Sequence, residues 1–410
     1  MLRRLALSLT SVVLVVGLAV GLSLISPLRR PPAQTVSLIH ATRLTCLTAG
    51  RALVLGDAPI SATPLGERTS PSADGPIDEE FTGPTVLVSN DLIVGGVLSS
   101  DPNGYTPCVT ALPTGVLQVL DPASTELVLV NTDANEAVVD LTLLGSDGEI
   151  SAVGGRGIAI APGVSRTVAL SVLAPQGPVG VLYNTSAGRV SALVRQVEGR
   201  SALDTLAGTP AESQVIGGIP ADAQSAQLVL SNPSENRVAV TVAALGATST
   251  YEPAPAADLS VDPLSTVVVD LGSSLGAEAS ALRISSAEAV GASVLFGDQG
   301  SQASIRATDP GRRLGVLAAD AGSVLVTNPG VEPVTADIVA GGSLTTVELQ
   351  PGTTTAVPVT ATEVGPIRIE ADGPVLAVAR SQDGALSYPL SPTEDAEANA
   401  GVVQADPGLR

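Results

Sequence analysis

The chain has no tryptophan, one histidine and two cysteines among its 410 residues, and aromatic residues make up only 1% of it. A zinc site needs three or four histidine and cysteine ligands at regular spacing, which this inventory does not supply. A Ser/His/Asp triad would have to use His40, and no Gly-x-Ser-x-Gly turn accompanies it. We therefore predict no catalytic residue, no metal ligand and no cofactor-binding residue, and we expect the protein not to be an enzyme.

Lysine is absent as well, so every basic side chain is an arginine. The 20 basic residues are outnumbered by 40 acidic ones, and the formal net charge is −20. Proteins that bind the phosphate backbone of nucleic acids need a clustered basic face. The charge therefore excludes nucleic acid as an expected partner.

The abundant residues are small and aliphatic. Hydrophobic residues make up 44% of the chain, and 42 glycines and 31 prolines interrupt them. This content is enough for several packed cores. Abundant β-branched residues separated by frequent turn residues indicate an all-β protein.

The longest uncharged run lies at the N-terminus. It extends from Leu5 to Ser26, with arginine pairs before and after it. As a helix it would reach roughly 33 Å, which is enough to cross a hydrocarbon core of about 30 Å. We predict a cytoplasmic segment at residues 1–4 and an uncleaved transmembrane signal anchor at residues 5–27. A cleaved signal peptide is the alternative, but it would have a shorter apolar core.

The two cysteines, Cys46 and Cys108, both follow the predicted anchor. A cysteine pair in one segment of a translocated chain is typical of a disulfide. Closing a loop of 62 residues (108 − 46) would contribute about 4 kcal/mol in the chain-entropy model. We expect a disulfide and an extracytoplasmic location, and two unrelated thiols in a cytosolic protein are the alternative.

One pattern recurs three times. A short apolar run ends at Asn131, Asn232 and Asn328, and a second apolar run closes at a glycine 14 positions after each asparagine (145 − 131, 246 − 232, 342 − 328). The copies are spaced by 101 (232 − 131) and 96 (328 − 232) residues, which is too long for solenoid units. The sequence therefore predicts three copies of a domain-sized module.

Within each copy the second run alternates, as Val238, Val240 and Val242 show, and this is the period of a strand with one buried face. A proline-containing turn and a third strand follow, and two further strands joined by short links close the unit as tight hairpins. In the third copy the glycine-to-proline interval is 9 residues (351 − 342) instead of 17 (162 − 145), so a loop is shortened there. We predict immunoglobulin-like β-sandwiches at residues 122–206, 213–307 and 314–392.

The flanking sections are less regular. Residues 34–120 are expected to form a partial β-domain that contains the cysteine pair, and residues 86–90 resemble the opening of the repeat without continuing it. Residues 393–410 are acidic and weakly apolar. Because such a segment buries too little surface to offset its ordering entropy, we expect a disordered tail.

Carboxylates and asparagines offer the remaining candidate sites. The acidic segments at residues 101–104, 146–149 and 372–373 lack the calcium-loop ladder and match common turn sequences. The repeated asparagines are expected to fold their side chains back onto the turn backbone. The six aromatic residues are too scattered to form a sugar-stacking platform.

Three sequence motifs add to the evidence from the N-terminal apolar run and the early cysteine pair. These are Leu-Val-Leu-x-Asn-Pro, Gly-Ile-Ala-Ile-Ala-Pro-Gly at residues 157–163, and Gly-Arg-Val-Ser-Ala-Leu-Val at residues 188–194. Together they resemble a family of envelope proteins of unknown function from high-GC Gram-positive bacteria, with one N-terminal span and a β-rich exterior. The aromatic residues that this family implies after the second cysteine are replaced here by Val109-Thr-Ala-Leu-Pro. The resemblance implies no catalytic residues.

We therefore expect a non-enzymatic, single-pass protein of the cell membrane, with most of the chain outside the cytoplasm. It would contact the membrane through its N-terminal helix and act as a scaffold or protein-binding partner in the cell envelope. Whether it contacts envelope proteins or polysaccharide stays open. An adhesin or glycan-binding module is the first alternative, and a hydrolase that uses carboxylates is the second.

Overall fold

The computed structural model describes residues 42–67, 72–100, 103–174, 176–198, 201–221, 223, 225–298 and 301–393. All of them belong to one compact unit, residues 39–396. The predicted anchor at residues 5–27, His40 and the predicted tail beyond Thr393 lie outside the described residues. Among the residues that are described, no helix has the length and apolar character needed to cross a bilayer.

The described chain is almost entirely β-structure, as the sequence predicts. Every strand pair is antiparallel, and the strands form several small sheets. The exceptions are a four-residue helix, α2 (Leu170–Leu173), and short 3-10 turns. We group the strands into a first module (residues 42–107) and repeats 1 (114–206), 2 (211–306) and 3 (311–392).

The strands of each group follow in chain order. The first module contains β1 (Thr42–Cys46), β2 (Gly50–Leu55), β3 (Ile60–Pro64), β4 (Ser72–Ala73), β5 (Ile77–Phe81), β6 (Thr85–Ser89), β7 (Val94–Ser100) and β8 (Asn103–Pro107). Repeat 1 contains β9 (Thr114–Val119), β10 (Thr125–Asn131), β11 (Ala137–Gly145), β12 (Gly148–Ile150), β13 (Ile158–Ile160), β14 (Val164–Ala169), β15 (Val179–Ala187), β16 (Ser191–Glu198) and β17 (Ser201–Leu206).

Repeats 2 and 3 continue the series. Repeat 2 contains β18 (Ala211–Ile219), β19 (Ser225–Asn232), β20 (Val238–Leu245), β21 (Thr250–Tyr251), β22 (Ser260–Val261), β23 (Ser265–Asp270), β24 (Ser280–Asp298) and β25 (Ser301–Arg306). Repeat 3 contains β26 (Gly311–Ala318), β27 (Ala321–Asn328), β28 (Val334–Ala340), β29 (Ser343–Leu349), β30 (Thr353–Ala361), β31 (Gly365–Arg380), β32 (Ser387–Pro389) and β33 (Ser391–Pro392).

All four groups share one pairing scheme, in which we letter the main strands A to G. Strand E pairs with A and C in one sheet, while strand B pairs with D and F in the other, and F also pairs with G. In the first module these are the pairs of β6 with β1 and β3, of β2 with β5 and β7, and of β7 with β8. The section expected to be a partial β-domain thus has the same seven pairing positions as the repeats.

The expectation of tight hairpins between the last two long strands is wrong. In repeat 1, β15 pairs with β9 and β11, whereas the following strand β16 pairs with β10 and β17. In repeats 2 and 3 the two strands are halves of β24 and β31, and each half joins a different sheet. The short link therefore carries the chain from one sheet to the other, because each strand finds its partners elsewhere.

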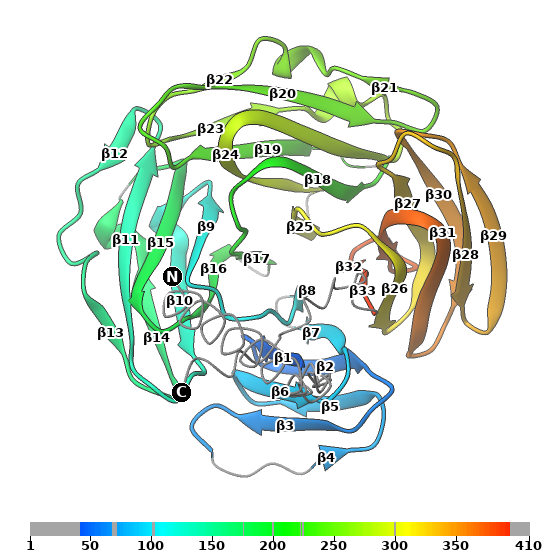
Figure 1. Cartoon of the computed structure of the whole chain (residues 1–410), viewed down its shortest axis with the longest axis horizontal. Coiled ribbons are helices and arrows are strands. Elements are labelled where there is room, and N and C mark those ends of the chain that lie inside the picture. The colour runs from blue at the N-terminus through cyan, green and yellow to red at the C-terminus, as the bar shows by residue number, and fades with distance from the viewer. Residues whose placement is uncertain are drawn as a thin grey trace, which may run out of the picture. The chain divides into compact units, whose positions relative to one another are not determined.

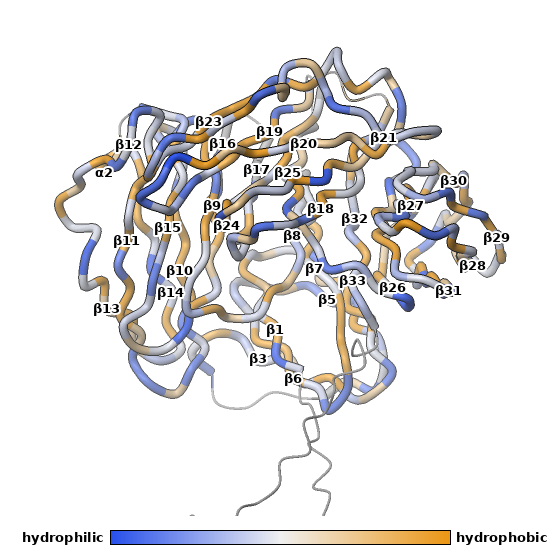
Figure 2. Tube along the Cα trace, turned by 45° about the horizontal axis from the view of Figure 1, so that its top comes forward, coloured by the Kyte–Doolittle hydropathy of each residue, from blue (hydrophilic) through white to orange (hydrophobic). Residues whose placement is uncertain are grey.

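Each group has its own hydrophobic cluster that draws residues from both of its sheets. Alternation puts one face of each strand inside, as the burial of Val238, Val240 and Val242 in β20 confirms. Aliphatic side chains dominate, and each group buries one large aromatic side chain: Phe81 in the first module, Tyr183 in repeat 1, Phe296 in repeat 2 and Tyr388 in repeat 3. Figure 2 shows the resulting alternation of apolar and polar positions along the strands.

Neighbouring groups, whose strands are labelled in Figure 1, contact each other through side chains. The first module meets repeat 1 at Leu47 and Val130, and repeat 1 meets repeat 2 at Leu120 and Val229. Repeat 2 meets repeat 3 where the Thr354 hydroxyl donates a hydrogen bond of 2.8 Å to the Leu245 carbonyl. Two further contacts join repeat 3 to the first module. Leu317 packs in one cluster with Leu53, and the Arg368 guanidinium lies 2.8 Å from the Asp57 carboxylate.

Candidate functional site

The three repeated asparagines end strand B, and each is fully buried. In repeat 2, Asn232 Nδ2 donates to the carbonyls of Asn236 and Val261 at 2.7 and 3.2 Å, while Oδ1 accepts from the Ser234 amide at 2.9 Å. Asn131 and Asn328 make the same set of bonds in their own repeats. The prediction that these side chains fold back onto the turn backbone is confirmed.

The asparagine bonds have a second consequence. One of the bonded carbonyls belongs to a distant segment near the start of strand D, for example Ile160, which lies 29 residues after Asn131. Each asparagine therefore ties the B–C loop to the C–D connection. Since both the amide nitrogen and the amide oxygen are engaged inside the protein, the asparagines are structural clamps and do not line a binding groove.

The first module has no such asparagine. The inward-facing residues of β2 are Ala52 and Val54, so the next inward position, equivalent to Asn131, is Gly56. A Cβ atom at Gly56 would lie 2.7 Å from the Ile93 side chain and 3.0 Å from that of Ile60. Apolar packing therefore occupies the space that a polar clamp fills in the repeats.

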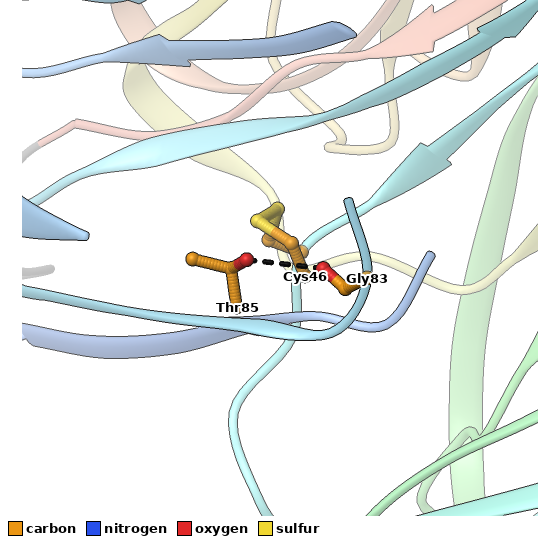
Figure 3. The surroundings of a disulfide bond; sticks show 4 residues. Cys46, Gly83 and Thr85 are labelled. Carbon is orange, nitrogen blue, oxygen red and sulfur yellow. Dashed lines mark hydrogen bonds between the residues drawn. A yellow bond between two sulfur atoms is a disulfide. The ribbon is translucent and has the colours of Figure 1, made fainter. Parts of the chain in front are cut away.

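Cys46 and Cys108 form the predicted disulfide, with an S–S distance of 2.02 Å. Cys46 ends β1, and Cys108 follows β8, so the bond joins the first strand of the module to the residue after its last strand. Both cysteines are buried, and Thr85 donates a hydrogen bond of 3.0 Å to the Gly83 carbonyl beside them (Figure 3). A disulfide is consistent with an extracytoplasmic location.

The turn expectation is confirmed for residues 146–147 and is wrong for Asp372 and Gly373, which lie within strand β31, and for residues 103–104, which begin β8. Asp147 lies in the turn between β11 and β12, and Glu149 is 3.8 Å from Arg156. Asp372 Oδ1 accepts a hydrogen bond of 2.9 Å from the Thr335 amide. Within the described ranges, no group of three or more histidine, cysteine or acidic side chains is arranged to hold a metal ion. Asp101 lies outside those ranges.

A polar cluster joins the G strands of neighbouring groups. Asp204 on β17 accepts two hydrogen bonds from Arg195, at 2.7 and 2.5 Å, and one of 2.6 Å from the Thr106 hydroxyl on β8. The hydrogen bond to Asp204 raises the pKa of Arg195, with desolvation opposing it. Because these side chains already hydrogen-bond to one another, the cluster is suited to joining modules.

The aromatic side chains serve the cores. Tyr105 on β8 packs edge-on against Tyr388 on β32, with ring centroids 4.8 Å apart. Burial raises the pKa of both phenols above their ordinary value, so both are neutral. Phe81, Phe296 and Tyr183 are buried too. These placements provide no exposed aromatic platform of the kind on which sugars stack.

The end of each repeat where the B–C loop faces the E–F link differs between copies. In repeat 1 the Asp133 carboxylate is 3.2 Å from the Arg189 guanidinium across this gap. In repeat 2 the Asn236 amide donates to Glu288 at 2.8 Å. Both gaps are therefore closed by a pair of side chains.

Repeat 3 leaves the equivalent gap open. Glycine or proline replaces at least one member of each bridging pair. Gly330 and Pro374 stand where repeat 1 has Asp133 and Arg189. Gly373 stands where repeat 2 has Glu288, and Glu332 takes the place of Asn236. In the part of repeat 3 that the structure describes, no side chain pair spans the gap, and a cleft of about 740 Å³ lies there. Volumes of this order are typical of ligand sites.

The lining of this cleft combines rigid, apolar and charged groups. Four prolines line it: Pro310, Pro329, Pro333 and Pro374. Val331 is 86% exposed, and Arg312 has neither an ion pair nor a hydrogen bond among the described residues. Glu332 and Asp372 add negative charge to the lining. The sequence offered one signal for this site, the exchange of bridging residues for glycine and proline in the third copy.

Comparison with known families finds a match to a family described as a family of unknown function, DUF5719, over residues 121–360. The chain belongs to this family. The DUF5719 match starts just before β10 and ends within β30, so it covers most of the three repeats and does not include the first module. A comparison with the curated proteins finds no match.

Among solved structures, this DUF5719 protein is similar to one whose title reads "Ca2+-stabilized adhesin helps an Antarctic bacterium reach out and bind ice". The two share 15% identity over 84% of this chain and 94% of that one, with a TM-score of 0.12.

Proposed function

We propose that this DUF5719 protein is a non-enzymatic, single-pass protein of a high-GC Gram-positive cell envelope. In this proposal residues 5–27 anchor it, and its immunoglobulin-like β-sandwich modules stand outside the membrane as a scaffold that binds a partner protein. The disulfide between Cys46 and Cys108 supports the outward location.

The observation that carries the binding role is the open cleft of repeat 3. Repeats 1 and 2 close the equivalent gap with a pair of side chains, so the fold does not require an opening there. The prolines hold its walls in fixed backbone conformations, which lowers the ordering cost of binding. Val331 offers an apolar contact, and the Arg312 guanidinium, which has no partner among the described residues, can bind a carboxylate with two parallel hydrogen bonds. A protein segment with an acidic side chain next to an apolar one matches this lining.

The binding role is tested by photo-crosslinking in intact cells. A crosslinking amino acid replaces Val331, and the matched control carries it at Val153, a valine of repeat 1 that is 98% exposed. We expect a specific envelope protein to be captured from position 331 and not from position 153, and Arg312→Ala to reduce that capture at least about tenfold, as losing a charged pair would. Capture of the same abundant proteins from both positions would contradict the proposal.

The outward location has its own test. Ser146 is exposed in the turn between β11 and β12, so Ser146→Cys adds one accessible thiol. A membrane-impermeant maleimide should label this variant in intact cells. Labelling that requires cell lysis would place the repeats in the cytoplasm and refute this part of the proposal.

A further inference from the structure

The shortened loop of repeat 3 changes the edge of its sheet. In repeats 1 and 2 the chain after strand C forms pairs of very short strands, β12 and β13 with three residues each, and β21 and β22 with two each. In repeat 3 the same connection is one continuous strand of seven residues, β29. The deletion noted in the sequence has therefore produced a full-length edge strand.

The outer side of β29 is unpaired. Among the described strands it pairs with β28 alone, and Figure 1 shows it at the outer end of its sheet. The hairpin turns at Gly341 and Gly342, both with positive φ (56° and 76°), which is the geometry of a two-residue turn. Because antiparallel ladders alternate, such a turn directs the N–H and C=O groups of Leu344, Thr346 and Glu348 away from β28.

This edge lacks the devices that usually protect a free edge. Charged side chains, proline, bulges and short length all discourage pairing with another chain. Strand β5 of the first module carries three consecutive acidic residues, Asp78, Glu79 and Glu80. Strand β29 reads Ser-Leu-Thr-Thr-Val-Glu-Leu, with one charge and no proline or glycine.

The face beside the edge is apolar and exposed. Leu344 is 64% exposed, and its direct partner on β28, Val339, is 41% exposed. Paired large apolar side chains on a wet sheet face are typical of a surface that is covered in an assembly.

We propose that β29 pairs with β29 of a second copy of this chain, antiparallel and centred on Thr346. Thr346 then faces its own counterpart, and Leu344 of each copy faces Glu348 of the other. All three outward N–H and C=O pairs find partners in this register, and the two glutamates stay apart. A parallel arrangement in register would place Glu348 against Glu348, which like-charge repulsion disfavours. The strand is thus self-complementary in the antiparallel orientation. Pairing joins the four strands β29, β28, β31 and β26 of each copy into one continuous sheet.

The test uses the full-length chain in non-ionic detergent and sedimentation velocity. We expect a dimer that dissociates on dilution. Thr346→Pro removes the central outward N–H and leaves the backbone ladder bonds to β28 in place, so it should abolish the dimer. It also removes the hydrogen bond of 2.5 Å that the Thr346 hydroxyl donates to Asp337 on β28. The matched control is Thr335→Lys, on the same exposed face but on β28, which should leave the dimer intact.

A charge exchange separates pairing from misfolding. Thr346→Lys and Thr346→Glu each place like charges opposite each other, and each should weaken dimerisation about fivefold. An equimolar mixture of the two should restore it, which a folding defect does not explain. A chain that is monomeric at all concentrations, a dimer that persists in Thr346→Pro, or β29 found paired with a different protein in place of a second copy would overturn the proposal.

Discussion

The first module and the three repeats share one strand pairing but are closed by different chemistry. Each repeat has a buried asparagine that ties its B–C loop to a distant segment, and none has a cysteine. The first module has Gly56 at the equivalent position and a disulfide between its first strand and the residue after its last. The comparison shows that the pairing scheme tolerates either a hydrogen-bonded or a covalent closure.

The largest expected effect comes from removing the covalent closure. The double variant Cys46→Ala/Cys108→Ala releases a loop of 62 residues, so the first module should lose about 4 kcal/mol of stability. Urea unfolding followed by circular dichroism measures this, since the chain has no tryptophan to serve as a fluorescence probe. An unchanged first transition would show that the module does not depend on its disulfide.

Removing one asparagine clamp should have the next largest effect. Asn232→Ala leaves the Ser234 amide and the Val261 carbonyl without their side chain partner, at a cost of about 3 kcal/mol. The matched control is Asn236→Ala, an exposed asparagine of the same loop that bonds to Glu288. Equal losses in the two variants, measured by thermal unfolding, would mean that Asn232 is not a clamp.

Removing the Asp204 carboxylate, which joins repeat 1 to the first module, should have an intermediate effect on stability. Asp204→Asn leaves Arg195, whose side chain is 33% exposed, without its counter-ion, and we expect a loss of about 2 kcal/mol. Asp133→Asn removes a more exposed ion pair of repeat 1 and should cost less than about 1 kcal/mol. The order of the two melting temperatures checks the prediction, and a reversed order would contradict it.

The smallest expected effect is an acid dependence of the first module. The hydrogen bonds from Arg51, at 2.6 and 2.8 Å, hold the pKa of Asp78 below its ordinary value of 3.8. A lowered carboxyl pKa stabilises the fold above the unfolded pKa, and the contribution is lost as the pH falls below about 4. Both side chains are more than a third exposed, so the loss should stay below about 0.5 kcal/mol. Asp78→Asn should flatten the stability profile below pH 4, and an equally steep profile would contradict this assignment.

The fold class and the repeat framework could be predicted from the sequence because they follow from local patterns. Alternation revealed the buried face of β20, and the cysteine pair revealed the disulfide. The asparagine position was also readable, since an asparagine after an apolar strand commonly bonds to its own turn.

The fourth copy of the pairing scheme was not predicted. Residues 86–90 resemble the opening of the repeat, but they form strand E of the first module. The true counterpart of strand B is β2, whose run Ala-Leu-Val-Leu-Gly ends at Gly56 in place of the asparagine. The exchange of a single residue hid the copy, because the asparagine was the most specific part of the pattern.

The sheet switch between strands E and F was missed for a different reason. A short link between two apolar strands has the same local sequence whether the strands pair with each other or with others. The partners are decided by the packing of the whole module. The cleft of repeat 3 belongs to the same class, since it appears only when Gly330 and Pro374 are compared with the bridging pairs of the other copies.

The first module is a complete unit closed by its disulfide, while each repeat is closed by its own asparagine clamp. Hydrogen–deuterium exchange of the intact chain, oxidised and reduced, tests this claim most directly. We expect the strands of the first module to be protected in the oxidised chain and to lose protection on reduction, while β10, β19 and β27 keep theirs. A uniform loss along the chain, or a first module without protection even when oxidised, would contradict it.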